Sequence, residues 1–141
     1  MSGTGSMRDY NRQVIEEFRA NGGKVGGQLA NSPLLLLTTT GAKTGQERVA
    51  PLGYARDGDR YVVLASMLGA PKHPDWYRNL VAHPDVTVEV GTERFAARAT
   101  TAEGAERERL VAYLATAMPF LADHQARTTR QIPIVLLEQT S

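Results

Sequence analysis

Two cationic side chains and a hydroxyl group lie within one short turn of the sequence. The apolar run over 34–37 and three threonines lead into the glycine-bounded segment GAKTG, which displays Lys43 and Thr44, and Arg48 follows closely. Backbone N–H groups exposed by glycine and cationic side chains can converge on the same oxygen atoms, so this combination is typical of a site for an anionic group. Gly, Thr and Lys are also ordinary turn residues, which leaves a β-hairpin with a solvated tip as the alternative.

The other reactive side chains exclude several kinds of chemistry. The sequence has no cysteine, so disulfides, thiolate catalysis and iron–sulfur clusters are ruled out. The three histidines, His73, His83 and His124, lack the spacing and the acidic neighbours of a metal site, and we expect no metal. Ser66 has no base and orienting acid beside it, which argues against a serine hydrolase.

Composition indicates one globular domain that binds a small ligand. The chain has 141 residues, of which 42% are hydrophobic and 22% charged, and its net charge is +1. This charge gives no global attraction to nucleic acid or membrane, so any anion binding must be local. The sequence contains no membrane span or signal core, and we expect a cytoplasmic protein. We expect 1–7 to be a disordered N-terminus or an expression remnant, and 8–141 to be a single domain.

Alternating apolar positions and turn signals predict an antiparallel barrel or sheet with helices on its outside. Val86, Val88 and Val90 alternate with polar residues, and the segment DGD at 57–59 is a hairpin signal between two strands. The expected strands cover 34–40, 48–56, 60–66, 86–90, 95–101 and 132–138, and the expected helices cover 8–20, 74–83 and 103–117.

Two peripheral segments have more than one interpretation. Tyr10, Val14 and Phe18 form an apolar stripe on the helix over 8–20. This helix is a lid or a contact with a membrane surface, or it packs on its own barrel. The segment 119–131 is predicted to be irregular and polar, as lids over a site often are.

Three co-linear stretches closely resemble one known family. They are GAKTGQERVAPLGYARDGDRYVVLAS, GAPKHPDWYRNLVAHPDVTVEVG and QARTTRQIPIVLLE, and they resemble the deazaflavin-dependent nitroreductases of actinobacteria over about residues 8–139. The resemblance implies an α+β, mainly β fold: a split β-barrel of about six mostly antiparallel strands with three or so peripheral helices. It also implies coenzyme F-420 as the cofactor.

The resemblance further implies which residues bind that cofactor: a wall for its acidic tail and ring edge, a segment along the ring, and the start of a short helix. The wall comprises Ala42, Lys43, Thr44, Arg48, Val49, Ala50, Pro51 and Leu52; the ring segment Leu64, Ala65, Ser66 and Met67; the helix start Asp75, Trp76, Tyr77, Arg78 and Asn79. Arginine suits bidentate phosphate contact, whereas lysine acts as a point charge. A buried edge strand at 48–52 and a core role for Trp76 are the alternatives.

The substrate segment departs from the best-known nitroreductase pattern. Met118, Leu121 and His124 stand where that pattern has tyrosines. An apolar pocket with one imidazole suits a quinone or an α,β-unsaturated carbonyl better than a nitro group that needs several hydrogen bonds. We expect Ser66 or His124 to be the catalytic residue that orients or protonates the acceptor.

Three functions remain open at this point. The first is hydride transfer from reduced coenzyme F-420 to a quinone, an enone or, less favoured, a nitroaromatic compound. The second is an FMN-dependent split-barrel oxidoreductase, and the third is a non-catalytic carrier or storage protein for F-420. We expect a monomer or weak dimer without a nucleic-acid partner, in the cytoplasm or associated with the membrane through its N-terminal helix.

Overall fold

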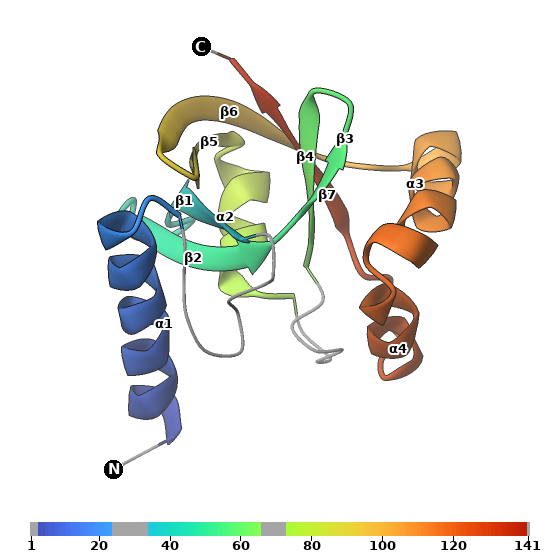
Figure 1. Ribbon diagram of the computed structural model, residues 1–141. Coiled ribbons are helices and arrows are strands. Elements are labelled where there is room, and N and C mark those ends of the chain that lie inside the picture. Colours follow the sequence, from blue (N-terminus) through green and yellow to red (C-terminus); the bar gives the residue numbers. More distant parts are fainter. Residues whose placement is uncertain (1–2, 24–33, 66–72, 141) are drawn as a thin grey trace.

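Seven strands form one antiparallel sheet in the part of the chain that the structure describes. The structure is a computed structural model that describes residues 3–23, 34–65 and 73–140, with side chains from residue 12 onward (Figure 1). The strands are β1 (Leu34–Thr40), β2 (Glu47–Gly53), β3 (Ala55–Asp57), β4 (Arg60–Leu64), β5 (Asp85–Val90), β6 (Glu93–Thr101) and β7 (Ile134–Gln139). The helices are α1 (Gly3–Ala20), α2 (Asp75–Ala82), α3 (Gly104–Ala117) and α4 (Phe120–Ala126).

The strand order, β2-β1-β5-β6-β7-β4-β3, explains how the sheet curls. The two edge strands, β2 and β3, are consecutive in the chain and are separated only by Tyr54. One bent segment therefore runs from one edge of the sheet to the other, as Figure 1 shows in green. The ring of Tyr54 meets that of Tyr61 edge-on, with centroids 5.3 Å apart. This curled half-barrel with peripheral helices confirms the predicted fold class.

The interior of the curled sheet is filled by alternate residues of its strands. Phe95, Ala97 and Ala99 of β6 face inward, while the residues between them are exposed. Leu80 of α2 closes one end of this cluster. Period-two alternation in the sequence therefore marks the inner face correctly.

Two strands, β4 and β7, are buried on both faces because helices cover their outer side. On β7, Val135 and Leu137 enter the interior, whereas Ile134 and Leu136 pack with Leu110 and its neighbours on α3 and α4. A strand of this kind is a continuous apolar run rather than an alternating one, as its sequence IVLL is.

The segment 119–131 was expected to be irregular, and this prediction is wrong for Phe120–Ala126, which forms α4. Leu121 is buried in the cluster formed with α3, together with Met118. Tertiary burial therefore stabilises a helix that is too short to be marked by periodicity. Because α4 is part of this packing, the observation on which a mobile lid was predicted here is removed.

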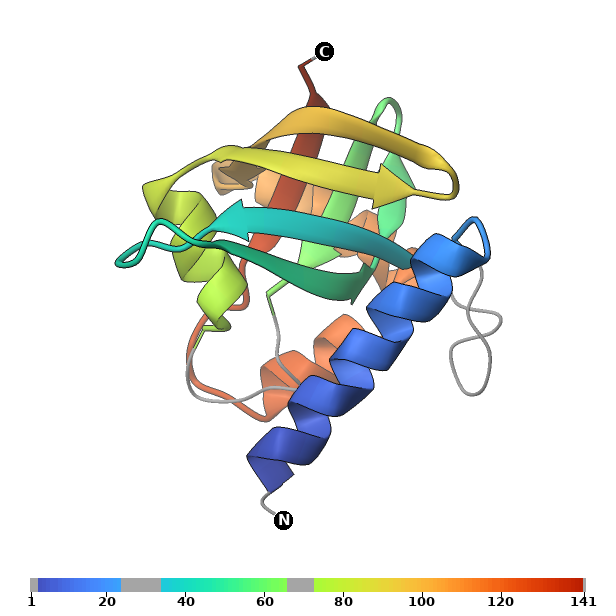
Figure 2. The same cartoon turned by 90° about the vertical axis from the view of Figure 1, so that its left-hand side faces the viewer.

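Helix α1 begins at Gly3, earlier than the apolar stripe from which a helix over 8–20 was predicted. Val14 and Phe18 are buried, and Arg19 donates two hydrogen bonds to the carboxylate of Glu89 on β5, at 3.1 and 2.8 Å. The helix crosses the outside of the sheet in Figure 2. Its described apolar side chains thus pack on the barrel. None of the described helices is long and apolar enough to span a membrane.

Candidate active site

The GAKTG turn between β1 and β2 is closed by its own hydrogen bonds. The backbone N–H of Gly41 donates to the carbonyl of Gln46 at 2.8 Å, and that of Gly45 donates to Gly41 at 3.0 Å. The Thr44 hydroxyl accepts from the Gln46 N–H at 3.2 Å. Gly45 has φ +71°, and a Cβ at Gly41 would lie 2.6 Å from the Thr44 Oγ1. Both glycines are therefore required for this compact shape.

Asn79 of α2 joins this turn to the helix. Its Oδ1 accepts from the backbone N–H of Ala42 at 3.0 Å, and its Nδ2 donates to the Thr39 hydroxyl at 3.2 Å. The side chain is buried, with 8% of the residue exposed. Two of the segments that the resemblance selected, 42–44 and 75–79, are thus in direct contact. Their pairing has no signal in the sequence, because the partners are far apart along the chain.

The turn presents its cations to solvent. Lys43 and Arg48 are exposed, and neither forms a hydrogen bond or an ion pair with any described residue. Beyond Arg48, Val49–Leu52 of β2 are half-buried, and Leu52 packs against the interior cluster. β2 pairs only with β1, which makes it an edge strand and explains why Pro51 is tolerated.

The start of α2 contributes two aromatic side chains. Trp76 and Tyr77 are half-buried, pack against the interior cluster and meet edge-on, with ring centroids 6.4 Å apart. The Tyr77 hydroxyl is 3.0 Å from the Thr101 hydroxyl. Asp75 and Arg78 of the same helix are exposed.

The predicted ring segment is only partly described. Leu64 is buried, and its side chain packs with the cluster under α3 and α4 rather than in the barrel interior. Ala65 is fully buried, and its N–H donates to the carbonyl of Pro133 at 3.1 Å. Ser66 and Met67 lie outside the described residues.

The histidines differ in their surroundings. His124 is half-buried on α4, its ring lies 5.0 Å from that of Phe120, and burial lowers its pKa, with Arg127 adding to this effect and Asp123 opposing it. His73, which precedes α2, was given no role from the sequence. Its Nδ1 lies 2.9 Å from the Arg130 guanidinium. No three His, Cys, Asp or Glu side chains among the described residues could hold a metal ion.

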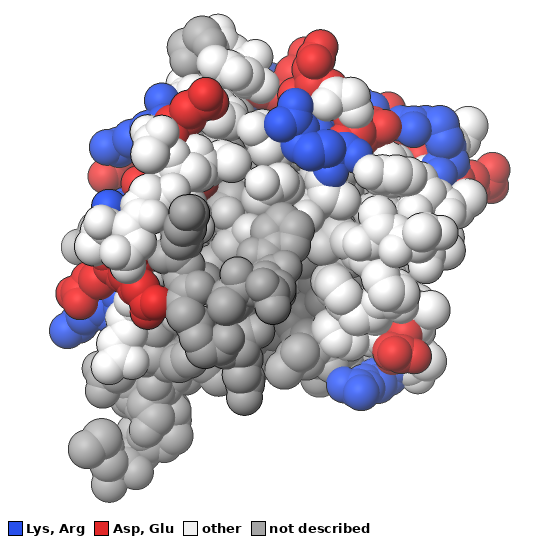
Figure 3. Space-filling model, viewed as in Figure 1, with Lys and Arg blue, Asp and Glu red and all other residues white. Residues whose placement is uncertain are grey.

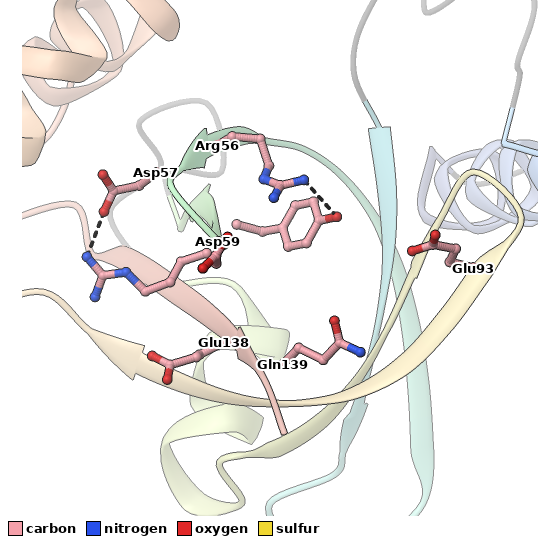
Figure 4. Close-up of a pocket in the computed structure, with 8 residues that line it drawn as sticks. Arg56, Asp57, Asp59, Glu93, Glu138 and Gln139 are labelled. Carbon is pink, nitrogen blue, oxygen red and sulfur yellow. Dashed lines mark hydrogen bonds and ion pairs between the residues drawn. The ribbon is translucent and has the colours of Figure 1, made fainter. Parts of the chain in front are cut away.

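A polar pocket lies at the other end of the barrel, away from the turn. It has a volume of about 680 Å³ and contains none of the residues selected from the sequence. Figure 4 shows polar side chains from the β3–β4 hairpin, the start of β6 and the end of β7 around it. Its lining residues are Arg56, Asp57, Asp59, Arg60, Tyr61, Glu93, Glu138 and Gln139.

The arginines at this pocket are already engaged by neighbouring side chains. Asp57 accepts from Arg60 at 2.6 Å and from Arg109 at 3.0 and 3.1 Å. Arg109 first, and then Arg60, lower the Asp57 pKa to about 2. The Arg56 guanidinium lies 4.3 Å from the ring centre of Tyr61 and donates to its hydroxyl at 3.1 Å. On the face in Figure 3, charges of both signs intermingle along the upper edge, over this hairpin.

Comparison with known proteins places these observations in a family. A model of the family described as F420H(2)-dependent quinone reductase matches residues 10–139. An F420H(2)-dependent quinone reductase of Mycobacterium tuberculosis is 42% identical over 125 residues, which are 85% of this chain and 83% of that protein.

Two solved structures are similar over much of the chain. An F420-H2 dependent reductase, FDR-A, has a TM-score of 0.68 and 40% identity over 75% of this chain and 94% of its own. A protein described as a domain-swapped dimer has a TM-score of 0.71 and 36% identity over 97% of this chain and 100% of its own.

Proposed function

The chain belongs to the F420H(2)-dependent quinone reductase family, a family of oxidoreductases, and from this premise we propose that it transfers a hydride from reduced coenzyme F-420 to a quinone. The observation that supports this most is a pair of exposed cations, Lys43 on the turn that Asn79 holds against α2 and Arg48 just after it, neither of which forms an ion pair with a described residue. When bound, the deazaflavin supplies the hydride; the protein has to bind it, orient it and exclude water.

The residues at the turn fit the acidic tail of this cofactor. Phosphate and glutamate groups are anionic, and Lys43 and Arg48 can approach them without breaking an existing ion pair. The half-buried segment Val49–Leu52 and the aromatic side chains of α2, Trp76 and Tyr77, would bound the flat ring. We propose the remaining members of the wall and ring segments as cofactor contacts on the resemblance alone.

The acceptor and its proton source are a further part of the proposal. The buried, apolar Met118 and Leu121 favour a quinone or enone over a nitroaromatic acceptor, because they offer no hydrogen-bond donor. We propose that His124 or Ser66 orients the acceptor carbonyl. Burial lowers the His124 pKa, which favours the neutral imidazole, and a neutral imidazole would donate one N–H.

Two other functions, an FMN-dependent oxidoreductase and a non-catalytic F-420 carrier, can be distinguished from this proposal by binding and turnover measurements. An FMN-dependent enzyme would use the turn for one phosphate, and a carrier would bind F-420 without turnover. Titration with each cofactor, followed by fluorescence quenching, should give micromolar or tighter binding of F-420 and weaker binding of FMN. FMN binding that equals or exceeds that of F-420 would overturn the cofactor assignment.

The reduced complex should then be offered a quinone, an enone and a bicyclic nitroimidazole. We expect kcat/KM to fall in that order. A reversed order would contradict the interpretation of Met118 and Leu121. Binding of F-420 with no turnover of any acceptor would favour the carrier.

The proposal also covers the oligomeric state and the cellular location of the protein. We propose a cytoplasmic monomer or weak dimer, because the described apolar stripe of α1 is buried on its own barrel. Size-exclusion chromatography with light scattering measures the oligomeric state. Sedimentation with anionic lipid vesicles tests for membrane contact: protein bound to the vesicles would show that α1 or another surface does contact membranes.

A further inference from the structure

Two basic side chains meet just before the start of α2, and Arg78 follows on the helix itself. The His73 Nδ1 lies 2.9 Å from the Arg130 Nη1, although the two residues are 57 positions apart in the chain. Its ring packs on that of Tyr77, with centroids 5.0 Å apart. Burial lowers the His73 pKa, and the charges of Arg130 and then Arg78 add to this effect.

The position of Arg130 is fixed by its backbone. Its carbonyl accepts from the Gln125 side chain at 2.6 Å, and its N–H donates to the Thr128 hydroxyl at 3.3 Å. Gln125 also accepts from the N–H of Ile132 at 2.9 Å. These hydrogen bonds hold the segment between α4 and β7 at several points. The contact of Arg130 with His73 is therefore supported by an ordered backbone.

The contact between His73 and Arg130 determines where the imidazole carries its proton. A guanidinium has only donors and stays protonated, so the His73 Nδ1 must accept and cannot carry a hydrogen. The ring is therefore neutral, and its proton is on Nε2. His73 offers one N–H donor between two permanent positive charges, and Arg78 forms no ion pair with any described residue.

We infer that His73, Arg78 and Arg130 form a subsite for anionic oxygen atoms, separate from the Lys43–Arg48 turn. A neutral donor with two guanidinium groups matches a phosphate or a carboxylate, which accepts several hydrogen bonds and offsets the repulsion between the arginines. It does not match a cation. That the ligand is the acidic tail of F-420 rests on the proposed function, whereas the affinity for anions does not.

Both basic groups are tied to α2, because His73 precedes the helix and Asn79 within it holds the Ala42 N–H of the turn. One extended anion with several charged groups could therefore contact both. The shared chemistry is an anionic oxygen, and the phosphodiester or a glutamate carboxylate can supply it.

The first experiment uses inorganic phosphate and glutarate as probes of the ligand-free full-length protein. We expect saturable shifts of the His73 imidazole C–H resonances in proton NMR, with those of His83 unchanged. Arg130→Gln and Arg78→Gln should weaken phosphate binding at least about tenfold, the loss of a charge-assisted hydrogen bond. Arg130→Lys should retain part of it.

Arg98→Gln is the matched control, since it removes one exposed arginine on β6 and should leave the dissociation constant unchanged. Unmoved His73 resonances, or equal phosphate affinity in Arg130→Gln and wild type, would overturn the subsite. If Arg130→Gln is poorly folded by circular dichroism, Arg78→Gln decides, because the Arg78 side chain is exposed and forms no hydrogen bond or ion pair with any described residue.

The second experiment compares F-420 with its form lacking glutamates. An equal loss of affinity for both forms in Arg130→Gln assigns the subsite to the phosphodiester, and a loss only for the glutamate-bearing form assigns it to a carboxylate. Phosphate binding without F-420 binding would retain the subsite and reject the proposed function. F-420 affinity unchanged in both Arg130→Gln and Arg78→Gln would reject the tail as its ligand.

Discussion

The two ends of the barrel both carry charged turns, but they use charge differently. At the β3–β4 hairpin, Asp57 is enclosed by Arg60 and Arg109, and Arg56 lies on the Tyr61 ring. At the GAKTG turn, Lys43 and Arg48 form no such contacts with the described residues. The hairpin end has a polar pocket, yet the two arginines that line it, Arg56 and Arg60, already contact Tyr61 and Asp57.

This difference separates structural charge from charge that is available to a ligand. A ligand anion at the hairpin would compete with carboxylates that already occupy the arginines. At the turn it would meet two exposed cations that form no ion pair with any described residue. The described pocket lies at the hairpin end, whereas the state of the charged groups favours the turn, which the family resemblance also favours.

The largest expected effect is on cofactor binding at the turn. Lys43→Ala and Arg48→Ala should each lose roughly 1–3 kcal/mol of F-420 binding free energy, the range for hydrogen bonds to charged groups. Because both side chains are exposed and form no ion pair with the described part of the chain, the melting temperature should hardly change. Fluorescence titration and thermal unfolding of the same samples check both parts. A variant with a lowered melting temperature and unchanged F-420 affinity would show that these cations serve stability rather than binding.

The next effect concerns the contact that holds the turn on α2. Asn79→Ala should lower the free energy of unfolding by about 1–3 kcal/mol, because the Ala42 N–H and the Thr39 hydroxyl lose their buried partner. Urea unfolding measures this. Asn21→Ala, an exposed position, is the matched control and should stay within about 0.5 kcal/mol of wild type. Equal stability of the two variants would show that Asn79 does not fix the turn.

A smaller effect is expected at the paired end. Asp57→Asn should cost on the order of 1 kcal/mol of stability, since the ion pairs are partly solvated. F-420 affinity should be unchanged. A loss of affinity in this variant would show that the hairpin end takes part in binding.

The same carboxylate predicts a pH dependence. Its pKa is lowered from 3.8 to about 2, so its contribution is complete above about pH 4 and disappears as the pH falls toward 2. Between these values the wild-type protein should lose more stability than Asp57→Asn does. Urea unfolding at pH 5, 4 and 3 tests this. If the free energy of unfolding falls equally with pH in both proteins, Asp57 is not the cause of the loss.

The smallest effect should come from an isolated surface pair. Arg98 and Asp85 approach only to 3.6 Å and are both largely exposed. Arg98→Gln should change stability and F-420 affinity by less than about 0.5 kcal/mol. A larger change in affinity would mean that overall charge, rather than the placement of Lys43 and Arg48, controls binding.

Local patterns predicted most of the fold. Valine alternation located β5, and the DGD segment located the β3–β4 turn. Of the alternatives left open for the apolar stripe of α1, packing on the barrel is the one that the burial of Val14 and Phe18 supports. The single strand predicted over 48–56 is two strands, because the chain bends at Tyr54 and changes its pairing partner from β1 to β4. No local pattern encodes that change.

The candidate site was predictable only in part for the same reason. Residue types at the turn suggested an anion site, but the sequence could not show which cations are already paired. Arg109 reaches Asp57 across 52 positions, and Arg130 reaches His73 across 57. Such pairings depend on the tertiary fold, so the paired hairpin and the unpaired turn look equally polar in the sequence.

The most direct test of the account is to locate F-420 on the protein by the backbone amide chemical shifts of the full-length chain. We predict that adding the cofactor shifts Ala42–Gly45, Val49–Leu52 and the start of α2 most, excluding Pro51, which has no amide proton. Arg56–Arg60 at the hairpin should stay unchanged. Shifts concentrated at Arg56–Arg60 and around Glu138, with none at the GAKTG turn, would contradict the central claim.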